Sequence, residues 1–219
     1  MIRNNIFMKN YLMKTRSALG ALSFLICSPS LAGTIDVAEL ESLLKQREFQ
    51  QIAQILVTRP ADDTEVLAWL RSHKDDWNPP LMSDLSFRLI AQIKKTPNKE
   101  LANELSVTYS RAKTGYFVDR ADCKTKTRQT QNHSETIGIL DTIIMNGFRP
   151  PKTVVLSWAQ DAIEWSKKMH AKNQMAAATW LCGADNLLPE IERSANRLKN
   201  QDEMQAQIKS LLENPAIGN

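Results

Sequence analysis

Side chains that commonly act as general bases are scarce in this sequence. The chain contains three histidines, His73, His133 and His170. His73 and His170 fall near the expected ends of helices, where an imidazolium ion interacts favourably with the helix dipole, and His133 falls in a polar stretch. We interpret all three as capping or surface residues rather than catalytic bases, and we expect no catalytic residue among them.

The spacings that metal and cofactor chemistry needs are also missing. No two histidines or cysteines have the short separation found in zinc sites, and the acidic pairs Asp62-Asp63 and Asp75-Asp76 do not continue into a calcium-binding loop. The sequence also lacks the nucleophile elbow, the phosphate-binding loop and the dinucleotide fingerprint. We therefore expect no metal and no cofactor, and we favour a protein without enzymatic activity.

The sequence has three cysteines, and Cys27 falls within the expected signal peptide, which leaves Cys123 and Cys182, far apart in the chain. Their wide spacing, in a chain that we expect to be exported, favours one disulfide. Closing a loop of this size stabilises a fold by about 4 kcal/mol in the chain-entropy account. The alternatives are a reactive thiol pair and half of a metal site.

One expected helix carries a candidate binding site. Trp158 and Trp165 lie two turns apart on one face of this helix, and Asp161 lies close to the same stripe. Two tryptophans beside a carboxylate can form a cleft for a sugar or a peptide. Large aromatic residues at helical spacing are also typical of a hydrophobic core, and this alternative stays open.

A second candidate is the basic stretch that follows Cys123. It contains Lys124, Lys126 and Arg128, and residues 124–134 include no apolar side chain. The composition predicts an exposed loop. Because a disulfide at Cys123 would hold one end of this loop, presenting the three charges to an acidic partner would cost less conformational entropy. The alternative is a simple connection.

Helices must position these residues, because apolar residues recur every three or four positions along almost the whole chain after Gly33. The sequence predicts an all-α fold, a multi-helix bundle or stacked helix pairs with one disulfide, without a fixed repeat period. We expect a single domain over 33–219 with two sub-blocks, about 33–123 and 135–219, joined by the polar loop. Helices are expected at about 36–44, 49–56, 64–72, 79–95, 98–123, 137–144, 151–169, 175–182 and 186–213.

Residues 1–32 have the features of a cleavable signal peptide. Lys14 and Arg16 precede an apolar run over 18–27, and small residues lead up to Ala32, after which we expect cleavage. The run is too short to span a membrane, for which about 20 apolar residues are needed, and no later stretch comes closer, so we expect no transmembrane segment. The pattern is compact from Met13 onward, which indicates Met13 as an alternative start.

The net charge of +4 gives no argument for a nucleic-acid partner. Residues 1–32 hold four of the 28 basic residues and none of the 24 acidic ones, so the rest of the chain is formally neutral. We expect a periplasmic or secreted protein of the bacterial envelope that binds an envelope protein, for example as an inhibitor or immunity protein. The alternatives are a cell-wall-acting enzyme with an unrecognised site and a small-ligand carrier that uses the helix of Trp158 and Trp165.

Overall fold

The computed structural model describes residues 35–213, and these residues form an all-α fold without a β-strand. The predicted fold class is therefore confirmed. The predicted signal peptide and its cleavage site lie outside the described residues. Between residues 35 and 213 no helix has both the length and the hydrophobicity needed to cross a membrane.

Except for α7 and α9, the helix boundaries follow the predicted ones closely. The elements are α2 (Val37–Lys45), α3 (Phe49–Val57), α4 (Thr64–Ser72), α5 (Pro79–Lys95), α6 (Lys99–Arg120), α7 (Arg128–Ile143), the π-helical turn η1 (Ile144–Phe148), α8 (Lys152–Ala171), α9 (Thr179–Cys182), the 3-10 turn η2 (Ala184–Asn186) and α10 (Glu190–Glu213).

Capping side chains explain where several helices begin. The side chains of Asp36, Asp63 and Asn98 accept hydrogen bonds from backbone N–H groups in the first turns of α2, α4 and α6. These N–H groups have no partner within the helix, so a capping acceptor stabilises each start by about 1 kcal/mol. Pro79 begins α5, where its missing N–H costs nothing.

The predicted polar loop is wrong over most of its length, because α7 begins at Arg128. Thr127 and Thr130 form a reciprocal capping box that starts the helix. His133 therefore lies on α7 and not in a loop. Its ring packs between the rings of Tyr116 and Trp180, with centroid distances of 5.3 and 4.9 Å. A run of polar residues concealed this helix because it packs through polar and aromatic contacts at its N-terminal end.

Helix α9 is shorter than predicted, since it begins at Thr179 and not near Met175. Backbone groups before it bond to other elements. Arg197 of α10 donates to the carbonyl oxygens of Met175 and Ala176 at 3.3 and 2.8 Å. The N–H of Ala178 donates to Asp122 at 3.0 Å. These bonds replace the intrahelical bonds that a longer helix would make.

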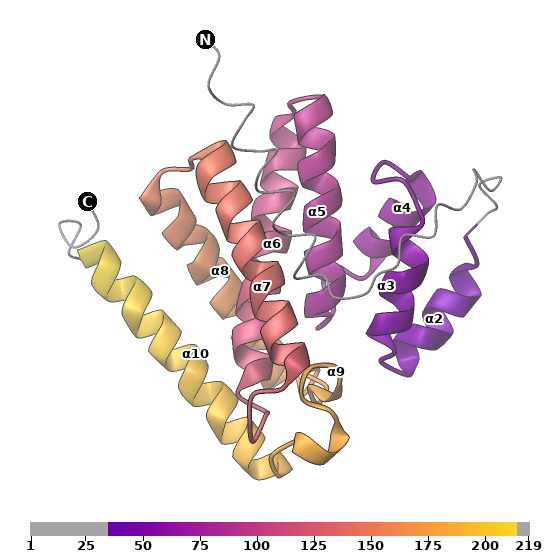
Figure 1. Ribbon diagram of the computed structural model, residues 1–219. Coiled ribbons are helices and arrows are strands. Elements are labelled where there is room, and N and C mark those ends of the chain that lie inside the picture. The colour runs from indigo at the N-terminus through magenta and orange to yellow at the C-terminus, as the bar shows by residue number, and fades with distance from the viewer. Residues whose placement is uncertain (1–34, 214–219) are drawn as a thin grey trace. The chain divides into compact units, whose positions relative to one another are not determined.

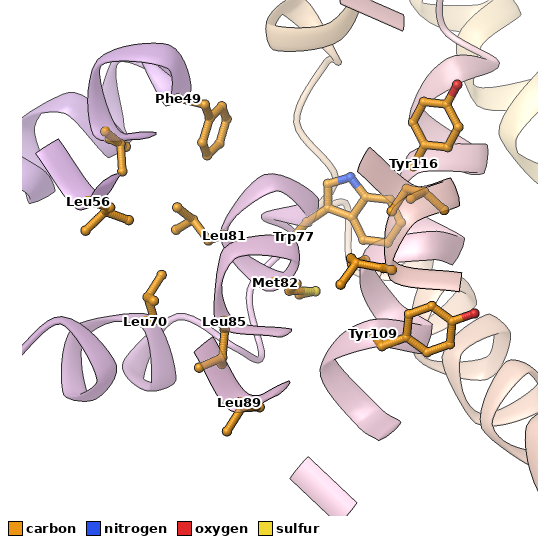
Figure 2. Packing of buried hydrophobic residues seen from close by; sticks show 14 of the residues in the cluster. Phe49, Leu56, Leu70, Trp77, Leu81, Met82, Leu85, Leu89, Tyr109 and Tyr116 are labelled. Carbon is orange, nitrogen blue, oxygen red and sulfur yellow. The ribbon is translucent and has the colours of Figure 1, made fainter. Parts of the chain in front are cut away.

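Helices α5 and α6 lie side by side at the centre of the packing, and α6 contacts the larger number of other helices. Helix α5 contacts α4 on one side and α6 on another, and α6 also packs against α7, α8 and α10. Figure 1 shows α10 running beside α8. Figure 2 shows leucines of α5, among them Leu81, Leu85 and Leu89, facing side chains of the preceding helices, with Met82 directed toward α6.

A glycine allows α5 to begin very close to α6. A Cβ atom placed on Gly115 of α6 would lie 2.5 Å from Cγ and 2.9 Å from Cβ of Pro79. Real Cβ atoms do not approach other carbon atoms this closely, and the ring of Pro79 is rigid. Gly115 is therefore required by packing between the two helices, and this contact fixes the position of the Trp77 segment that precedes α5.

Candidate functional site

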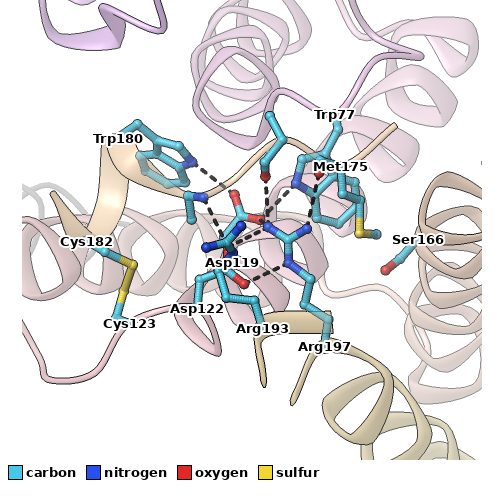
Figure 3. Close-up of polar contacts among 12 residues, drawn as sticks. Trp77, Asp119, Asp122, Cys123, Ser166, Met175, Trp180, Cys182, Arg193 and Arg197 are labelled. Carbon is cyan, nitrogen blue, oxygen red and sulfur yellow. Dashed lines mark hydrogen bonds and ion pairs between the residues drawn. A yellow bond between two sulfur atoms is a disulfide. The ribbon is translucent and has the colours of Figure 1, made fainter. Parts of the chain in front are cut away.

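The C-terminal end of α6 and the N-terminal half of α10 meet in a buried polar cluster, which we define as Asp119, Asp122, Arg197, Trp77 and Trp180 (Figure 3). Asp122 accepts two hydrogen bonds from the guanidinium group of Arg197, from Nε at 2.8 Å and from Nη2 at 2.5 Å. The Asp122 side chain is fully buried and that of Arg197 is 7% exposed. Two parallel charge-assisted bonds are the strongest pairing available to these groups.

Asp119 lies one turn before Asp122 and holds two tryptophans. Its Oδ1 accepts the indole N–H of Trp77 at 2.8 Å, and its Oδ2 accepts that of Trp180 at 2.9 Å. Arg197 lies 3.8 Å from Oδ1, because its shorter bonds go to Asp122. Burial raises the pKa of Asp119 to about 7, against the lowering influence of Arg197, while the nearby charge of Asp122 raises it further.

The polar cluster is a structural joint. Its members come from the segment before α5, from α6, from α9 and from α10, so one set of bonds fixes four parts of the chain. Every carboxylate oxygen in it accepts at least one hydrogen bond within the chain. Buried polar groups are tolerated when they are paired in this way. The cluster explains how the helices are held rather than how a ligand is bound.

The predicted disulfide is present beside this cluster. Cys123 and Cys182 are bonded, with their Cα atoms 5.2 Å apart, and they link the end of α6 to α9. Cys123 also forms an isolated antiparallel bridge with Leu187. Among residues 35–213, no group of three or more His, Cys, Asp or Glu side chains could hold a metal ion.

Farther along α10, the same helices separate and leave an open groove of about 400 Å³. We call it the α6–α8–α10 groove. It is lined by residues of three helices: Tyr109, Ser110, Lys113, Thr114 and Phe117 of α6, Val155, Trp158, Ala159 and Ile163 of α8, and Asn200, Glu203, Met204, Gln207 and Ile208 of α10.

Polar groups in the groove are partly held by internal bonds. The Nζ of Lys113 lies 2.9 Å from a carboxylate oxygen of Asp141, which also accepts a hydrogen bond from the hydroxyl of Tyr109. Burial, together with this bond, raises the pKa of Tyr109. The side-chain amide of Asn200 donates to the carbonyl oxygen of Phe117 at 2.8 Å. The groove therefore has apolar and aromatic lining residues, and the ammonium group of Lys113 is already paired with Asp141.

The structure separates the two tryptophans of the first predicted site. Trp158 is half-buried and lines the groove, whereas Asp161 is exposed and is not among the lining residues. Trp165 is buried in the core, where its ring stacks on that of Trp77 with centroids 4.9 Å apart, and the guanidinium of Arg111 lies 5.0 Å from its ring centroid. The core alternative therefore describes Trp165, whereas Trp158 is partly buried against the core and a binding role for it stays a prediction.

The three basic residues of the second predicted site lie near the start of α7 and are exposed. Lys124 donates to the backbone oxygen of Asp185 at 3.3 Å. Lys126, together with Arg120, lines a hollow of about 270 Å³ between α6 and α7. Arg128 is the first residue of α7. Their role in binding stays a prediction.

The histidines at helix ends make local contacts. His73 follows α4, where Nδ1 lies 2.9 Å from the carbonyl oxygen of Trp69 and Nε2 lies 3.2 Å from Glu41. His170 lies in the last turn of α8, with Nε2 3.2 Å from the hydroxyl of Ser194. Both positions agree with the predicted location near helix C-termini.

The sequence interpretation missed the polar cluster. Asp119 and Asp122 directly precede Cys123 at helical spacing, but their partner Arg197 lies 75 residues beyond Asp122. No short pattern connects residues at that separation. No protein-family model, curated protein or solved structure matches this chain. The geometry of the groove and of the polar cluster is therefore the basis for a functional proposal.

Proposed function

We propose that this chain is an exported binding protein of the bacterial envelope that acts through protein–protein contacts, and that the α6–α8–α10 groove receives an amphipathic helix of the partner. An inhibitor or immunity protein that covers a surface of an envelope enzyme is the concrete form of this proposal. The observation that carries it is the aromatic and apolar lining of the groove, in which Phe117, Trp158 and Met204 retain accessible surface.

The dimensions of the groove support a helical occupant. Each wall contributes positions spaced by three or four residues over nine residues of helix: 109 to 117, 155 to 163 and 200 to 208. From the first to the ninth residue an α-helix rises about 12 Å, a little more than two turns. An amphipathic helix fits such a site with anchors one and two turns apart.

The composition of the lining also supports a protein partner. Tryptophan, tyrosine, phenylalanine and methionine are enriched in the centres of protein interfaces, and the groove contains Trp158, Tyr109, Phe117 and Met204. Charged side chains lie at its edge: Lys113 is neutralised by Asp141, and the Glu203 side chain is 59% exposed. An apolar centre within a polar rim is the usual arrangement of a binding surface.

The disulfide supports the proposed location in an oxidising compartment. Structural disulfides persist where the environment is oxidising, as in the periplasm or outside the cell. This agrees with the predicted signal peptide over residues 1–32, and we propose periplasmic or secreted localisation after cleavage near Ala32. Intact mass spectrometry of protein recovered from the periplasm should give a chain that begins at Gly33, and a retained leader would contradict the proposal.

The test is site-specific photo-crosslinking in cells. A photoreactive residue at Phe117 or Gln207, both in the groove lining, should form a covalent adduct with one dominant protein, and the cross-linked peptide should lie in a helical segment of that protein. The same photoreactive residue at Val57 of α3, which is 68% exposed, serves as the surface control. Adducts that are equally strong at Val57 would contradict a groove-specific partner.

Variants that fill the groove complete the test. Ala159→Arg places a long side chain in the groove without removing a core residue, and it should abolish the adduct while circular dichroism and thermal unfolding stay unchanged.

The triple change of Lys124, Lys126 and Arg128 to Ala tests these three basic residues in the same assay. If the triple variant loses the adduct more strongly than Ala159→Arg, the interface lies at the start of α7 and not in the groove.

One observation favours a second candidate function, a small-ligand carrier. The groove volume of about 400 Å³ lies within the range of ligand sites, about 300–1,000 Å³, and an indole lines it. Native mass spectrometry of the chain purified under mild conditions distinguishes the two. A bound small molecule that is lost in Ala159→Arg supports the carrier, and an empty chain that cross-links to a protein supports the binding protein.

A further inference from the structure

The connection between α7 and α8 ends in a short exposed segment, which we call the α7–α8 tip and define as residues 146–154. Every residue of the tip except Pro150 is exposed. It contains two consecutive prolines and the side chains of Phe148 and Val154, each of which is 37% exposed. Figure 1 shows the connection at the end of α7 and α8 that lies away from α9. The tip therefore presents apolar side chains at one extremity of the helices.

The α7–α8 tip also lies in a stretch without acidic residues. Between residues 142 and 160 the only charged side chains are those of Arg149 and Lys152. In the described part of the chain neither of them forms an ion pair. The acidic residue that precedes the stretch, Asp141, is already paired with Lys113 at 2.9 Å. Two cations without an internal partner therefore lie beside the exposed apolar side chains.

The backbone restricts the conformation of the tip. The π-helical turn η1 ends at Phe148, and Pro150 and Pro151 follow one residue later. Proline fixes its own φ angle and limits the residue before it. Arg149 has a φ of 47°, in the left-handed region where glycine and asparagine are usual. The local backbone does not favour an arginine here, and such uncommon conformations are found most often at functional sites.

We propose that the α7–α8 tip docks on an anionic phospholipid surface. Phe148 and Val154 would enter the interfacial layer, while Arg149 and Lys152 contact phosphate groups of the lipids. The strength of interfacial binding depends on buried apolar area together with electrostatic attraction to anionic lipids. Basic residues close to an anionic membrane are attracted to it, so the charge of the tip is complementary to this surface.

Charge distinguishes the tip from another exposed apolar position. Ile191 is 87% exposed, but Glu190 and Glu192 lie on either side of it. Carboxylates are repelled by a surface of phosphate groups, so exposure alone does not predict contact with lipid there. The tip is also much shorter than the about 20–30 residues that each partner contributes to a stable protein interface. Its size and charge together favour a lipid surface over a protein.

The contact should be weak and reversible. Even a single acyl chain gives only marginal membrane binding, and one partly exposed phenylalanine with two cations is a comparably small anchor. The tip would therefore orient the chain on the surface rather than fix it there. Val155, the next residue of α8, lines the α6–α8–α10 groove, so docking would hold one end of the groove near the lipid. The inference does not require the groove to have a partner.

Sedimentation with sucrose-loaded vesicles tests the docking. The chain as recovered from cells should partition onto vesicles of equal parts phosphatidylglycerol and phosphatidylcholine, and not onto vesicles of phosphatidylcholine alone. Raising the salt concentration from about 0.1 to about 1 M shortens the Debye length from about 10 to about 3 Å and should release the chain. Equal partition onto both kinds of vesicle, or none onto either, would overturn the proposal.

Paired variants locate the contact on the chain. Arg149→Gln and Lys152→Gln should each lower the partition coefficient about fivefold, and Phe148→Ser should lower it about tenfold. Lys199→Gln and Ile191→Ser are the matched controls, since these side chains of α10 are 74% and 87% exposed, and they should leave it unchanged. All variants have the same N-terminal segment, so differences between them report on the described surface. Controls that fall as far as the tip variants would contradict docking through the tip.

A label at Gly147 tests the contact without removing an apolar side chain. A Cβ atom placed on Gly147 has no neighbour within 4 Å, so Gly147→Cys should fold normally. An environment-sensitive fluorophore on this thiol should emit at shorter wavelength when the phosphatidylglycerol vesicles are added. The same fluorophore on Val57→Cys of α3, at a side chain that is 68% exposed, should not respond. Equal responses at the two positions, or none at 147, would count against the proposal.

A photoreactive residue in place of Phe148 distinguishes lipid from protein in cells. It should form adducts with lipid, and capture of a single protein instead would assign the tip to a protein partner and overturn the proposal. Cross-linking in the groove uses other positions, Phe117 and Gln207. Failure of the proposed function and failure of this inference can therefore be told apart.

Discussion

Helices α6 and α10 meet in two different ways along their length. Near the disulfide they close around the polar cluster, where Asp122 and Arg197 are buried and bonded to each other. Farther along, beyond Asn200, they diverge and leave the α6–α8–α10 groove. The same two helices therefore take part both in a closely bonded polar cluster and in the lining of an open groove.

The difference shows how stability and binding are divided along one pair of helices. In the polar cluster, charged groups are satisfied by partners within the chain, so a ligand has nothing to complete. In the groove, Trp158 and Met204 retain surface that another molecule can cover. Changes in the cluster should thus affect folding, and changes in the groove should affect binding with little effect on folding.

The largest expected effect comes from breaking the buried ion pair. Asp122→Ala leaves the guanidinium group of Arg197 buried without its main partner, and we expect unfolding to become easier by about 3–5 kcal/mol. Urea unfolding followed by far-UV circular dichroism measures this loss. Replacing both partners, as in Asp122→Leu with Arg197→Met, should cost clearly less than the single change. A double variant that is less stable than Asp122→Ala would contradict this account.

Removal of the disulfide should have the next largest effect. Replacing Cys123 and Cys182 with Ser should lower the free energy of unfolding by about 2–4 kcal/mol, because the unfolded chain gains freedom. The folded structure should persist, since Ala178 still bonds to Asp122 and Thr127 still donates to the carbonyl oxygen of Leu181. Near-UV circular dichroism of the variant should resemble that of the oxidised chain, and loss of that signal would show that these bonds are insufficient.

The protonation of Asp119 should make stability depend on pH. Its pKa is raised from 3.8 to about 7, so between these values the folded chain retains a proton that the unfolded chain has released. Stability from this group is full below about pH 4 and is lost as pH rises toward 7, by up to about 1.4 kcal/mol per pH unit. Fluorescence of Trp77 and Trp180 should change over the same range, because both indoles donate to this carboxyl group.

The titration of His133, a partly buried histidine, changes stability with pH in the opposite direction to that of Asp119. Burial lowers the pKa of His133 to about 4, so its contribution to stability rises with pH until about 6.5. The comparison with Asp119→Asn therefore isolates the carboxyl group. Between pH 6 and 8 the wild-type chain should lose stability and Asp119→Asn should not. Parallel curves for the two proteins in urea unfolding would contradict the assignment.

The smallest effect on folding is expected in the groove. Gln207→Ala and Glu203→Gln alter exposed lining residues, and each should change the free energy of unfolding by no more than about 0.5 kcal/mol. Adduct formation with the partner should still weaken in both. A loss of stability comparable with that of Asp122→Ala would mean that the groove is part of the core and would remove the contrast between the two regions.

The fold was largely predictable from the sequence because the signals that define a helix lie within a few residues of one another. The stripes of Leu81, Leu85 and Leu89, a proline at the start of α5 and a glycine after α9 are all short-range signals. The start of α7 was not predictable in this way, because its buried apolar residues begin only at Ile137, ten residues after the capping Thr127. Local pattern is informative only where a helix buries an apolar face.

The candidate site was predicted only in part for a related reason. Trp158 lines the groove, but its role in binding stays a prediction. Nothing in the spacing distinguishes it from Trp165, which stacks on Trp77 from a distant segment. Which of two tryptophans on one helix reaches the surface is decided by neighbours far away in the sequence. The same holds for Arg197, whose role depends on a carboxylate that only the folded chain brings near.

The close approach of Pro79 to Gly115 has a consequence for how this sequence can diverge. A side chain at position 115 collides with a rigid ring, so the two positions are not free to change independently. During the evolution of related sequences, Gly115 should be replaced by a larger residue only when Pro79 is lost at the same time or has been lost before. Aligned descendants of a common ancestor should therefore show these two columns changing as a pair, although 36 positions separate them in the printed sequence.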